Sequence, residues 1–488
     1  MPPARGSFQL GETIVLPGET RHVRLPVSES YVSTLVEIPV TVINGLQEGP
    51  VLLVTAASHG DECNGTAIVR ELIYGVDHST LRGVLVCAPV LNLPGFLRNE
   101  RNLPDGRDLN RNFPGKPDGN SAQRIAHMIF NKIVLKCNYG IDLHTAGRGR
   151  SNILQVRGDM TNPEVRRIAK AFGTEIVIDE PGLDGTLRRA ATEAGVPTIT
   201  AEVGESQRFE RPLVRAGLKG VMNVLYELGM LKGKVQPPLF QVIVKKTEWV
   251  RADRGGILEM YTKPRALLME GEEVCAITNP FGKEVSVVRA PFTGMVVGIT
   301  NYPMVSPGFP ICHMVKLDKT LATVENALRR ERTMKRGERP PEPLGEGAGR
   351  EEVVEESSAL GEENAKGAGA QSEEAPSASK ERVQIGGDEK IGGRIERIKT
   401  MRGEEQSGMG AGDAEKGGMG VGPREEGAGA GRAEGEARGT ARGEARATSV
   451  RGEGSEAGES AEREQDREGS STEYYEDYDE DAEPEEKE

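Results

Sequence analysis

The stretch that most constrains the fold runs from Val51 to Glu62 and reads VLLVTAASHGDE. It begins with a short, mostly β-branched apolar run and continues into a turn of small residues, a pattern typical of a buried central strand in a parallel sheet. The pattern places His59 and Glu62 on the loop just past the carboxyl end of that strand. Because ligands bind at this edge of an open α/β sheet, the loop is a candidate site.

Strand and helix patterns alternate along the chain around this stretch. Asn64–Tyr74 has apolar residues at helical spacing, and Gly83–Pro89 is the next short apolar run, an order that implies a right-handed parallel unit. Residues 7–50 carry short alternating segments that suit antiparallel strands at the sheet edge. The other predicted elements are strands at 139–145, 153–157, 174–179 and 197–203 and helices at 121–134, 162–172, 185–195 and 222–231. The sequence therefore predicts an α/β fold.

A second histidine falls at the same edge of the predicted sheet. The strand at 139–145 delivers His144 at its carboxyl end, where it can join His59 and Glu62 as a third ligand. Zinc accepts imidazole nitrogen and carboxylate oxygen at about 2.0–2.2 Å, and three protein ligands leave a fourth position for water, as in catalytic zinc sites. Asp142 faces the same side of the strand as His144. It either orients a ligand from behind or is a structural carboxylate.

A long polar loop follows the second predicted parallel strand. The segment from Arg98 to Gly115 reads RNERNLPDGRDLNRNFPG and is dense in arginine. Loops of this length in compact domains are often functional, and guanidinium groups bind carboxylates with two hydrogen bonds. Arg101, Asn110 and Arg111 are the candidate donors. On spacing alone, a solvated loop with surface arginines explains the segment equally well.

Glu202 interrupts the β-branched strand pattern PTITAEV at residues 197–203. A carboxylate buried at a strand end is costly unless it has a partner or a chemical task. Beside a water activated by zinc, it would serve as the general base.

The order HxxE, DLNRNFPG, DLHT and TAEVGE resembles the succinylglutamate desuccinylase/aspartoacylase family, relatives of the zinc carboxypeptidases, over about residues 35–320. The resemblance implies a carboxypeptidase-like mixed, mostly parallel sheet flanked by helices. It also implies one zinc ion per chain, held by His59, Glu62 and His144, with Glu202 as catalytic base.

The same resemblance assigns roles in the polar loop. Arg101 would polarise the scissile carbonyl, and Asn110 and Arg111 would hold the substrate carboxylate. The acyl-recognition residues of the best-known members have no definite match in this sequence, and Arg188 and Arg189 are the nearest candidates.

The predicted domains are a catalytic domain (1–235), a small β barrel-sandwich domain (236–320), a linker or short helix (321–334) and a disordered tail (335–488). The second domain is similar to biotinyl/lipoyl-like domains, but its NYPMVSPG hairpin tip lacks the lysine that would carry a prosthetic group. A lid or an oligomerisation role is the expectation instead. The tail is rich in Gly, Glu and Arg, ends in an acidic run, and has too little apolar content to fold.

Composition excludes several classes of partner. The formal net charge of −14 argues against a nucleic-acid-binding surface, and no apolar run is long enough for a membrane span or a signal peptide. The five cysteines form no CxxC pair, which favours reduced thiols and a cytoplasmic protein.

These patterns predict a zinc-dependent amidohydrolase, a deacylase that hydrolyses the amide bond of an N-acyl amino acid or similar small N-acylated amine. One alternative is a metallocarboxypeptidase-like peptidase using the same site. The other is a non-catalytic binding protein whose tail recruits a partner. The expected ligand is a small molecule, with neither nucleic acid nor membrane. A homo-oligomer and a protein partner for the tail both stay open.

Overall fold

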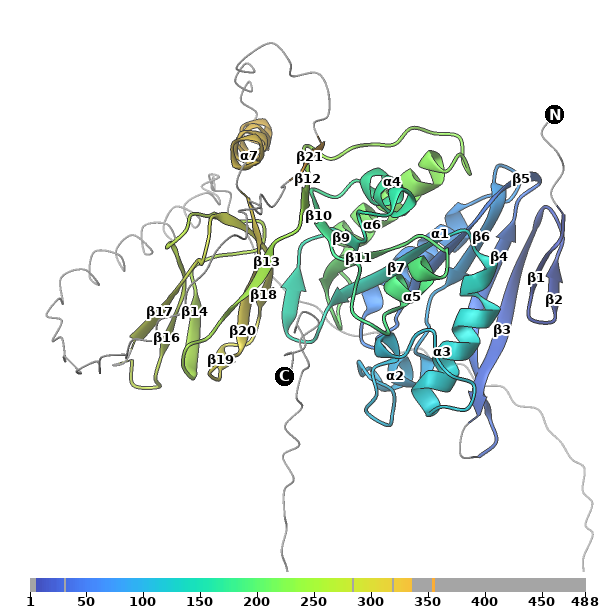
Figure 1. Ribbon diagram of the computed structural model, residues 1–488, viewed down its shortest axis with the longest axis horizontal. Coiled ribbons are helices and arrows are strands. Elements are labelled where there is room, and N and C mark those ends of the chain that lie inside the picture. The colour runs from blue at the N-terminus through green and yellow to red at the C-terminus, as the bar shows by residue number, and fades with distance from the viewer. Residues whose placement is uncertain (1–5, 30–31, 283–284, 318–319, 336–352, 356–488) are drawn as a thin grey trace, which may run out of the picture. The chain divides into compact units, whose positions relative to one another are not determined.

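A computed structural model describes residues 6–29, 32–282, 285–317, 320–335 and 353–355 (Figure 1). The predicted α/β architecture is confirmed: a large mixed sheet carries helices. The tail predicted at 335–488 lies almost wholly outside the described residues. None of the described helices is long and apolar enough to cross a membrane.

The central strand is β5 (Gln47–Ala56), as the apolar run at Val51 predicts. It pairs in parallel with β6 (Arg82–Ala88) on one side and β7 (Tyr139–Ala146) on the other. Its side chains alternate between two separate apolar cores, with Leu52 and Val54 in one and Val51 and Leu53 in the other. Burial on both faces explains why this strand reads as a continuous apolar run.

The rest of the sheet extends from this centre in both directions. The edge strands β3 (Glu19–Glu29) and β4 (Leu35–Asn44) are antiparallel, as predicted. On the other side β11 (Thr198–Glu205) pairs in parallel with β7, and its register sets Glu202 beside His144. The remaining strands there are β8 (Arg150–Asn152), β9 (Gln155–Gly158), β10 (Ile176–Asp179), β12 (Gln241–Val244) and β21 (Val353–Glu355), and a separate hairpin joins β1 (Phe8–Leu10) to β2 (Thr13–Val15).

The helices cover both faces of this sheet. Apolar residues of α1 (Cys63–Gly75), α4 (Pro163–Phe172) and α6 (Arg211–Glu227) belong to one core, and those of α3 (Ser121–Lys132) and α5 (Leu187–Glu193) belong to the other. The chain also forms α2 (Leu93–Arg98) and the 3-10 turns η1 (Leu109–Arg111) and η2 (Val134–Lys136).

The helix predicted at 222–231 is wrong in its bounds, because α6 begins at Arg211 and ends at Glu227. Gly217 and Gly220 weaken the helical pattern in its first half. Both are contact points: a Cβ on Gly217 would lie 2.5 Å from Cδ1 of Ile68, and one on Gly220 would lie 2.3 Å from Cε1 of Phe172. Close helix packing at these two positions outweighs the low helix propensity of glycine.

The C-terminal β region contributes to two sheets. Three of its strands, β13 (Thr247–Arg251), β18 (Gly294–Thr300) and β20 (Pro310–Lys316), prolong the large sheet, because β18 pairs with β8. A four-stranded sheet consists of β14 (Gly256–Met260), β16 (Glu273–Thr278), β17 (Val285–Arg289) and β19 (Met304–Val305), and β15 (Leu267–Leu268) pairs with β18. The region is all-β, as predicted, and the barrel-sandwich assignment stays an expectation.

The segment predicted as a linker or short helix (321–334) forms the helix α7 (Leu321–Lys335). Its Val324 and Leu328 are buried in an apolar core shared with β10, β12, β18 and β20. The helix therefore packs against strands from both the N-terminal part of the chain and the C-terminal β region.

Candidate metal centre and adjoining pocket

The loop after β5 turns sharply before it enters α1. Ala57 has a φ of 49°, and a Cβ on Gly60 would lie 2.1 Å from the carbonyl carbon of Gly95. The backbone of this loop is thus pressed against α2, a close approach that only glycine allows. As a result His59 and Glu62 are fixed at the edge of the sheet, 0% and 1% exposed.

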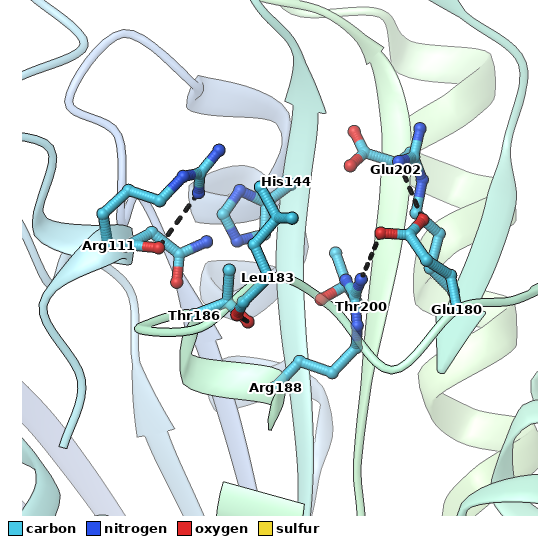
Figure 2. A pocket seen from close by; sticks show the side chains of 10 residues that line it. Arg111, His144, Glu180, Leu183, Thr186, Arg188, Thr200 and Glu202 are labelled. Carbon is cyan, nitrogen blue, oxygen red and sulfur yellow. Dashed lines mark hydrogen bonds and ion pairs between the residues drawn. The ribbon is translucent and has the colours of Figure 1, made fainter. Parts of the chain in front are cut away.

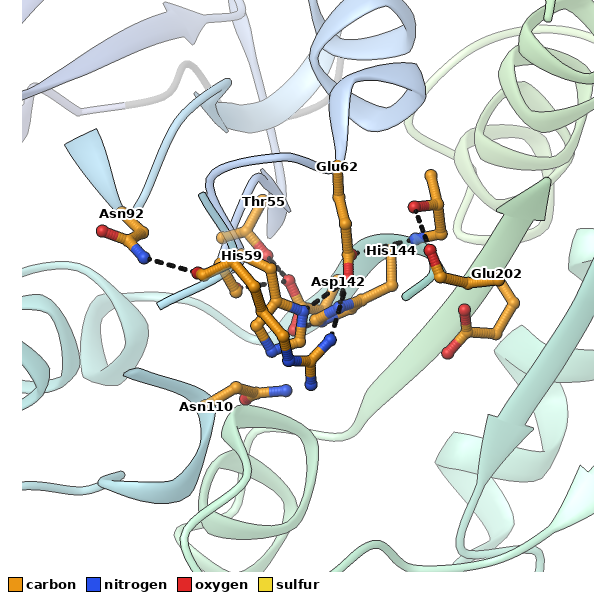
Figure 3. A network of polar contacts seen from close by, with 12 residues as sticks. Thr55, His59, Glu62, Asn92, Asn110, Asp142, His144 and Glu202 are labelled. Atoms are coloured by element: carbon orange, nitrogen blue, oxygen red, sulfur yellow. Dashed lines mark hydrogen bonds and ion pairs between the residues drawn. The ribbon is translucent and has the colours of Figure 1, made fainter. Parts of the chain in front are cut away.

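His59, Glu62 and His144 converge on one point at the carboxyl ends of β5 and β7 (Figure 3). The Nδ1 atom of His59 lies 2.6 Å from Oε1 of Glu62, and Nδ1 of His144 lies 3.0 Å from Oε2. One potential ligand atom from each residue falls within 4.8 Å of the others, and all three side chains are buried. We call this group the metal corner.

A carboxylate supports each imidazole of the metal corner from its other nitrogen. Asp142 lies 2.7 Å from Nε2 of His144, and Asp108 lies 3.2 Å from Nε2 of His59. The hydroxyl of Thr55 donates to Asp142 over 2.6 Å. Carboxylates in this position orient histidine ligands and raise their basicity. Asp142 was a candidate for this position from its place in the sequence, whereas Asp108 was not, although it begins the DLNRNFPG motif.

The charges of the metal corner depend on one another. Burial and Arg101 act to lower the pKa of His59, but Glu62 and Asp108 outweigh them and raise it to about 9. Burial opposes ionisation of Glu62, yet both histidines hold its pKa well below the usual range. Buried charges are tolerated only in such compensated groups. The two imidazoles and one carboxylate are buried, and each imidazole has a carboxylate at its other nitrogen. They fit the donor set that Zn²⁺ prefers, in which the metal would take the place of the imidazole protons.

Arg101 lies beside the metal corner on the polar loop. Its Nη1 is 3.4 Å from Oε1 of Glu62 and its Nη2 is 3.2 Å from Oδ2 of Asp108, and the side chain is 24% exposed. These two ion pairs hold the guanidinium at the rim of the metal corner. The structure thus distinguishes Arg101 from Arg98 and Arg107, which pair with Glu100 and Asp105.

A pocket of about 320 Å³, its open mouth included, adjoins the metal corner (Figure 2). Asn110, Arg111, His144 and Glu202 are among its lining residues. Asn110 is fixed because its Oδ1 accepts a 2.8 Å hydrogen bond from the backbone N–H of Leu187 at the start of α5. The pocket thus brings together predicted residues from the polar loop, β7 and β11.

The side of the pocket opposite Arg111 carries one carboxylate, that of Glu180, which is shared by two arginines. Glu180 accepts from Arg157 over 3.3 Å and from Arg188 over 3.4 Å, and both arginines are largely buried. We call these three residues the far wall. Arg188, a candidate from the sequence, lines the pocket. Arg189, the other candidate, pairs with Asp184 and Glu193, which are exposed. Arg157 and Glu180 were not predicted from the sequence, because they belong to no motif.

Comparisons with known proteins agree with this architecture. Residues 48–228 match the family model of the succinylglutamate desuccinylase/aspartoacylase catalytic domain. The chain is 28% identical over 255 residues to N-alpha-acetyl-L-2,4-diaminobutyric acid deacetylase of Halomonas elongata, covering 49% of this chain and 73% of that protein.

Solved structures are similar over a longer stretch of the chain. One is a succinylglutamate desuccinylase/aspartoacylase of Rhodobacter sphaeroides, with 25% identity, a TM-score of 0.55, and coverage of 61% of this chain and 95% of that one. Another is the product-bound ectoine utilization protein EutE of Ruegeria pomeroyi, with 24% identity, a TM-score of 0.57, and coverage of 65% and 98%. The similarity therefore spans nearly the whole of each of these two solved structures and about two thirds of this chain.

Proposed function

Since this chain belongs to the succinylglutamate desuccinylase/aspartoacylase family, we propose that it is a zinc-dependent amidohydrolase that removes the acyl group from a small N-acylated amino acid. The observation that carries the proposal is the buried group of His59, Glu62 and His144, because its His144 lines the same pocket as Glu202. The Halomonas elongata relative is named for deacetylation of an N-acetylated amino acid, the class of reaction proposed here.

The proposed mechanism assigns each step to residues of the pocket. A zinc ion held by His59, Glu62 and His144 would act as a Lewis acid on the scissile carbonyl and the attacking water. Glu202 takes a proton from that water and returns it to the departing amine. Arg101, fixed by its ion pairs, faces the negative charge that develops on the carbonyl oxygen.

The polar loop supplies substrate binding in this proposal. Arg111 donates to the substrate carboxylate, and the amide of Asn110, oriented by its bond to α5, donates beside it.

The test compares Glu202→Gln with the wild type on a panel of N-acetyl amino acids and on unblocked dipeptides. Loss of the general base should lower kcat by about 100-fold or more. Glu193→Gln, which removes a surface carboxylate paired with Arg189, is the matched control and should leave kcat unchanged. Full activity in Glu202→Gln would contradict the role of Glu202, and activity confined to the dipeptides would favour a peptidase.

We also propose that the enzyme works in the cytoplasm as a protein without nucleic-acid or membrane ligands. All five cysteines are free thiols, and four of them are buried. A reducing compartment keeps thiols in this state.

A further inference from the structure

We propose that Asn152 positions the carboxylate of Glu202, and that the C-terminal β region holds Asn152 in place. The inference rests on the proposed function, in which Glu202 is the general base. It assigns a catalytic contribution to strand β18, which lies almost a hundred residues beyond Glu202 in the sequence.

The first observation is the position of strand β8. It lies between β11, which carries Glu202, and β18 of the C-terminal β region. On one side Ser151 is in register with Glu205. On the other, Asn152 is in register with Gly298. The short strand β8 therefore links β18 to β11, the strand that carries the general base, so the place of β18 affects the place of β11.

The second observation is a direct contact with the base. Nδ2 of Asn152 donates to Oε2 of Glu202 over 3.4 Å. The side-chain nitrogen of asparagine can only donate, so this contact favours the ionised carboxylate and occupies one of its two oxygens. A general base must present a lone pair toward the proton that it removes. By engaging Oε2, Asn152 fixes the direction in which Oε1 is presented.

The third observation shows that β18 is shaped around Asn152. A Cβ on Gly298 would lie 2.5 Å from Oδ1 of Asn152, too close for any side chain without displacement. Gly298 also follows an irregularity in the pairing of β18 with β20. The absence of a side chain at this position makes room for the Asn152 amide.

Two further hydrogen bonds hold β8 against the C-terminal β region. The backbone N–H of Asn301 donates to the carbonyl of Gly149 over 2.6 Å, and Nδ2 of Asn301 donates to Oγ of Ser151 over 2.8 Å. These bonds fix the strand on the side that pairs with β18. The C-terminal β region is thus a support for the catalytic strand, in addition to any contact it makes with other molecules.

The direct test is Asn152→Asp, which keeps the side-chain shape and replaces the donor with a carboxylate that repels Glu202. We expect kcat to fall by about tenfold or more while KM stays within about threefold, because the substrate carboxylate is bound elsewhere. Zinc content, measured by elemental mass spectrometry on the full-length protein, should equal that of the wild type.

The remote test is Gly298→Ala in the C-terminal β region. Its methyl group would displace Asn152, so kcat should fall in the same direction with KM and zinc content preserved. Gly255→Ala is the matched control, since its Cβ would meet no atom closer than 3.4 Å, and it should leave kcat unchanged. In the double variant Asn152→Asp/Gly298→Ala, the second substitution should add little, because both act through one contact.

The outcomes separate this inference from the proposed function. If Glu202→Gln is inactive but Asn152→Asp and Gly298→Ala keep wild-type kcat, Asn152 has no positioning role and the proposed function stands. If Glu202→Gln is fully active, the proposed function fails first. Should Asn152→Asp lose zinc or fail to fold, Gly298→Ala decides, and independent effects of the two substitutions would overturn the inference.

Discussion

The metal corner and the far wall are both charged groups at one pocket, which His144 lines on one side and the far wall on another, but they are built from different kinds of chain segment. In the metal corner, His59 and Glu62 are at most 1% exposed and follow a central strand directly. In the far wall, Glu180 is 29% exposed and joins two arginines brought from β9 and α5. We therefore expect the strand ends to set the chemistry of the pocket, and the side chains from dispersed segments to set its selectivity.

The largest effect is expected from a substitution that removes a ligand of the metal corner. His144→Ala should remove zinc binding and lower kcat/KM by about 1,000-fold or more, because the remaining histidine and carboxylate cannot hold the metal alone. Zinc per chain and hydrolysis of an N-acetyl amino acid are the measurements. His127→Ala, which removes a histidine that contacts Asn131 within α3, is the control. Stoichiometric zinc in His144→Ala would contradict the ligand assignment.

A smaller effect is expected when only the support behind His144 is changed. Asp142→Asn keeps the shape of the side chain but removes the charge that lies 2.7 Å from Nε2. Zinc affinity should fall by about 10- to 100-fold, the usual cost of losing a carboxylate behind a histidine ligand. Competition with a chelator measures this affinity. An unchanged affinity would make Asp142 a purely structural carboxylate.

The far wall should respond in selectivity rather than in zinc affinity. Glu180 already serves two arginines, so the far wall carries a net positive charge and should favour substrates with an anionic side chain. Arg188→Met should lower the ratio of kcat/KM for acidic over neutral N-acetyl amino acids by about tenfold, the loss of one charge-assisted hydrogen bond. Arg189→Met is the matched surface control. Equal loss on both substrates would contradict a role in selectivity.

The smallest effect is expected one step further from the metal corner. Thr55→Val removes the hydroxyl that donates to Asp142 over 2.6 Å and leaves a side chain of similar shape. A buried acceptor that loses a donor costs about 1–3 kcal/mol, so the free energy of unfolding should fall by that amount. Zinc affinity should fall only a few-fold. Chemical denaturation and chelator competition measure the two quantities, and a Thr55→Ser variant should restore both.

Much of the fold could be predicted because its signals are local. The apolar run at Val51 identifies a strand buried on both faces, and Asn162 before Pro163 predicts the start of α4, where its side chain accepts from the N–H groups of Glu164 and Val165. Signals failed where tertiary contacts overrode them. The first half of α6 is helical because Gly217 and Gly220 allow close packing, which a propensity pattern cannot register.

In the candidate site too, residues in local motifs could be predicted and residues placed by tertiary contacts could not. Asp108 stands in a motif and could have been found as a partner of His59, since histidine ligands need an acceptor behind them. Glu180, Arg157 and Asn152 stand in no motif. Their proximity to the pocket depends on the pairing of β8, β9 and β11, and strand partners far apart in sequence leave no local pattern.

The sequence by itself determined the α/β class, the central strand and the convergence of His59, Glu62 and His144, because carboxyl ends of neighbouring parallel strands meet at one edge. Only the tertiary structure decided that Arg188 rather than Arg189 lines the pocket, and that β18 lies against β8. The first depends on which side of α5 faces the pocket, and the second on which strand pairs with the free edge of β8. Packing between distant segments decides that, after each element's local preferences have been met.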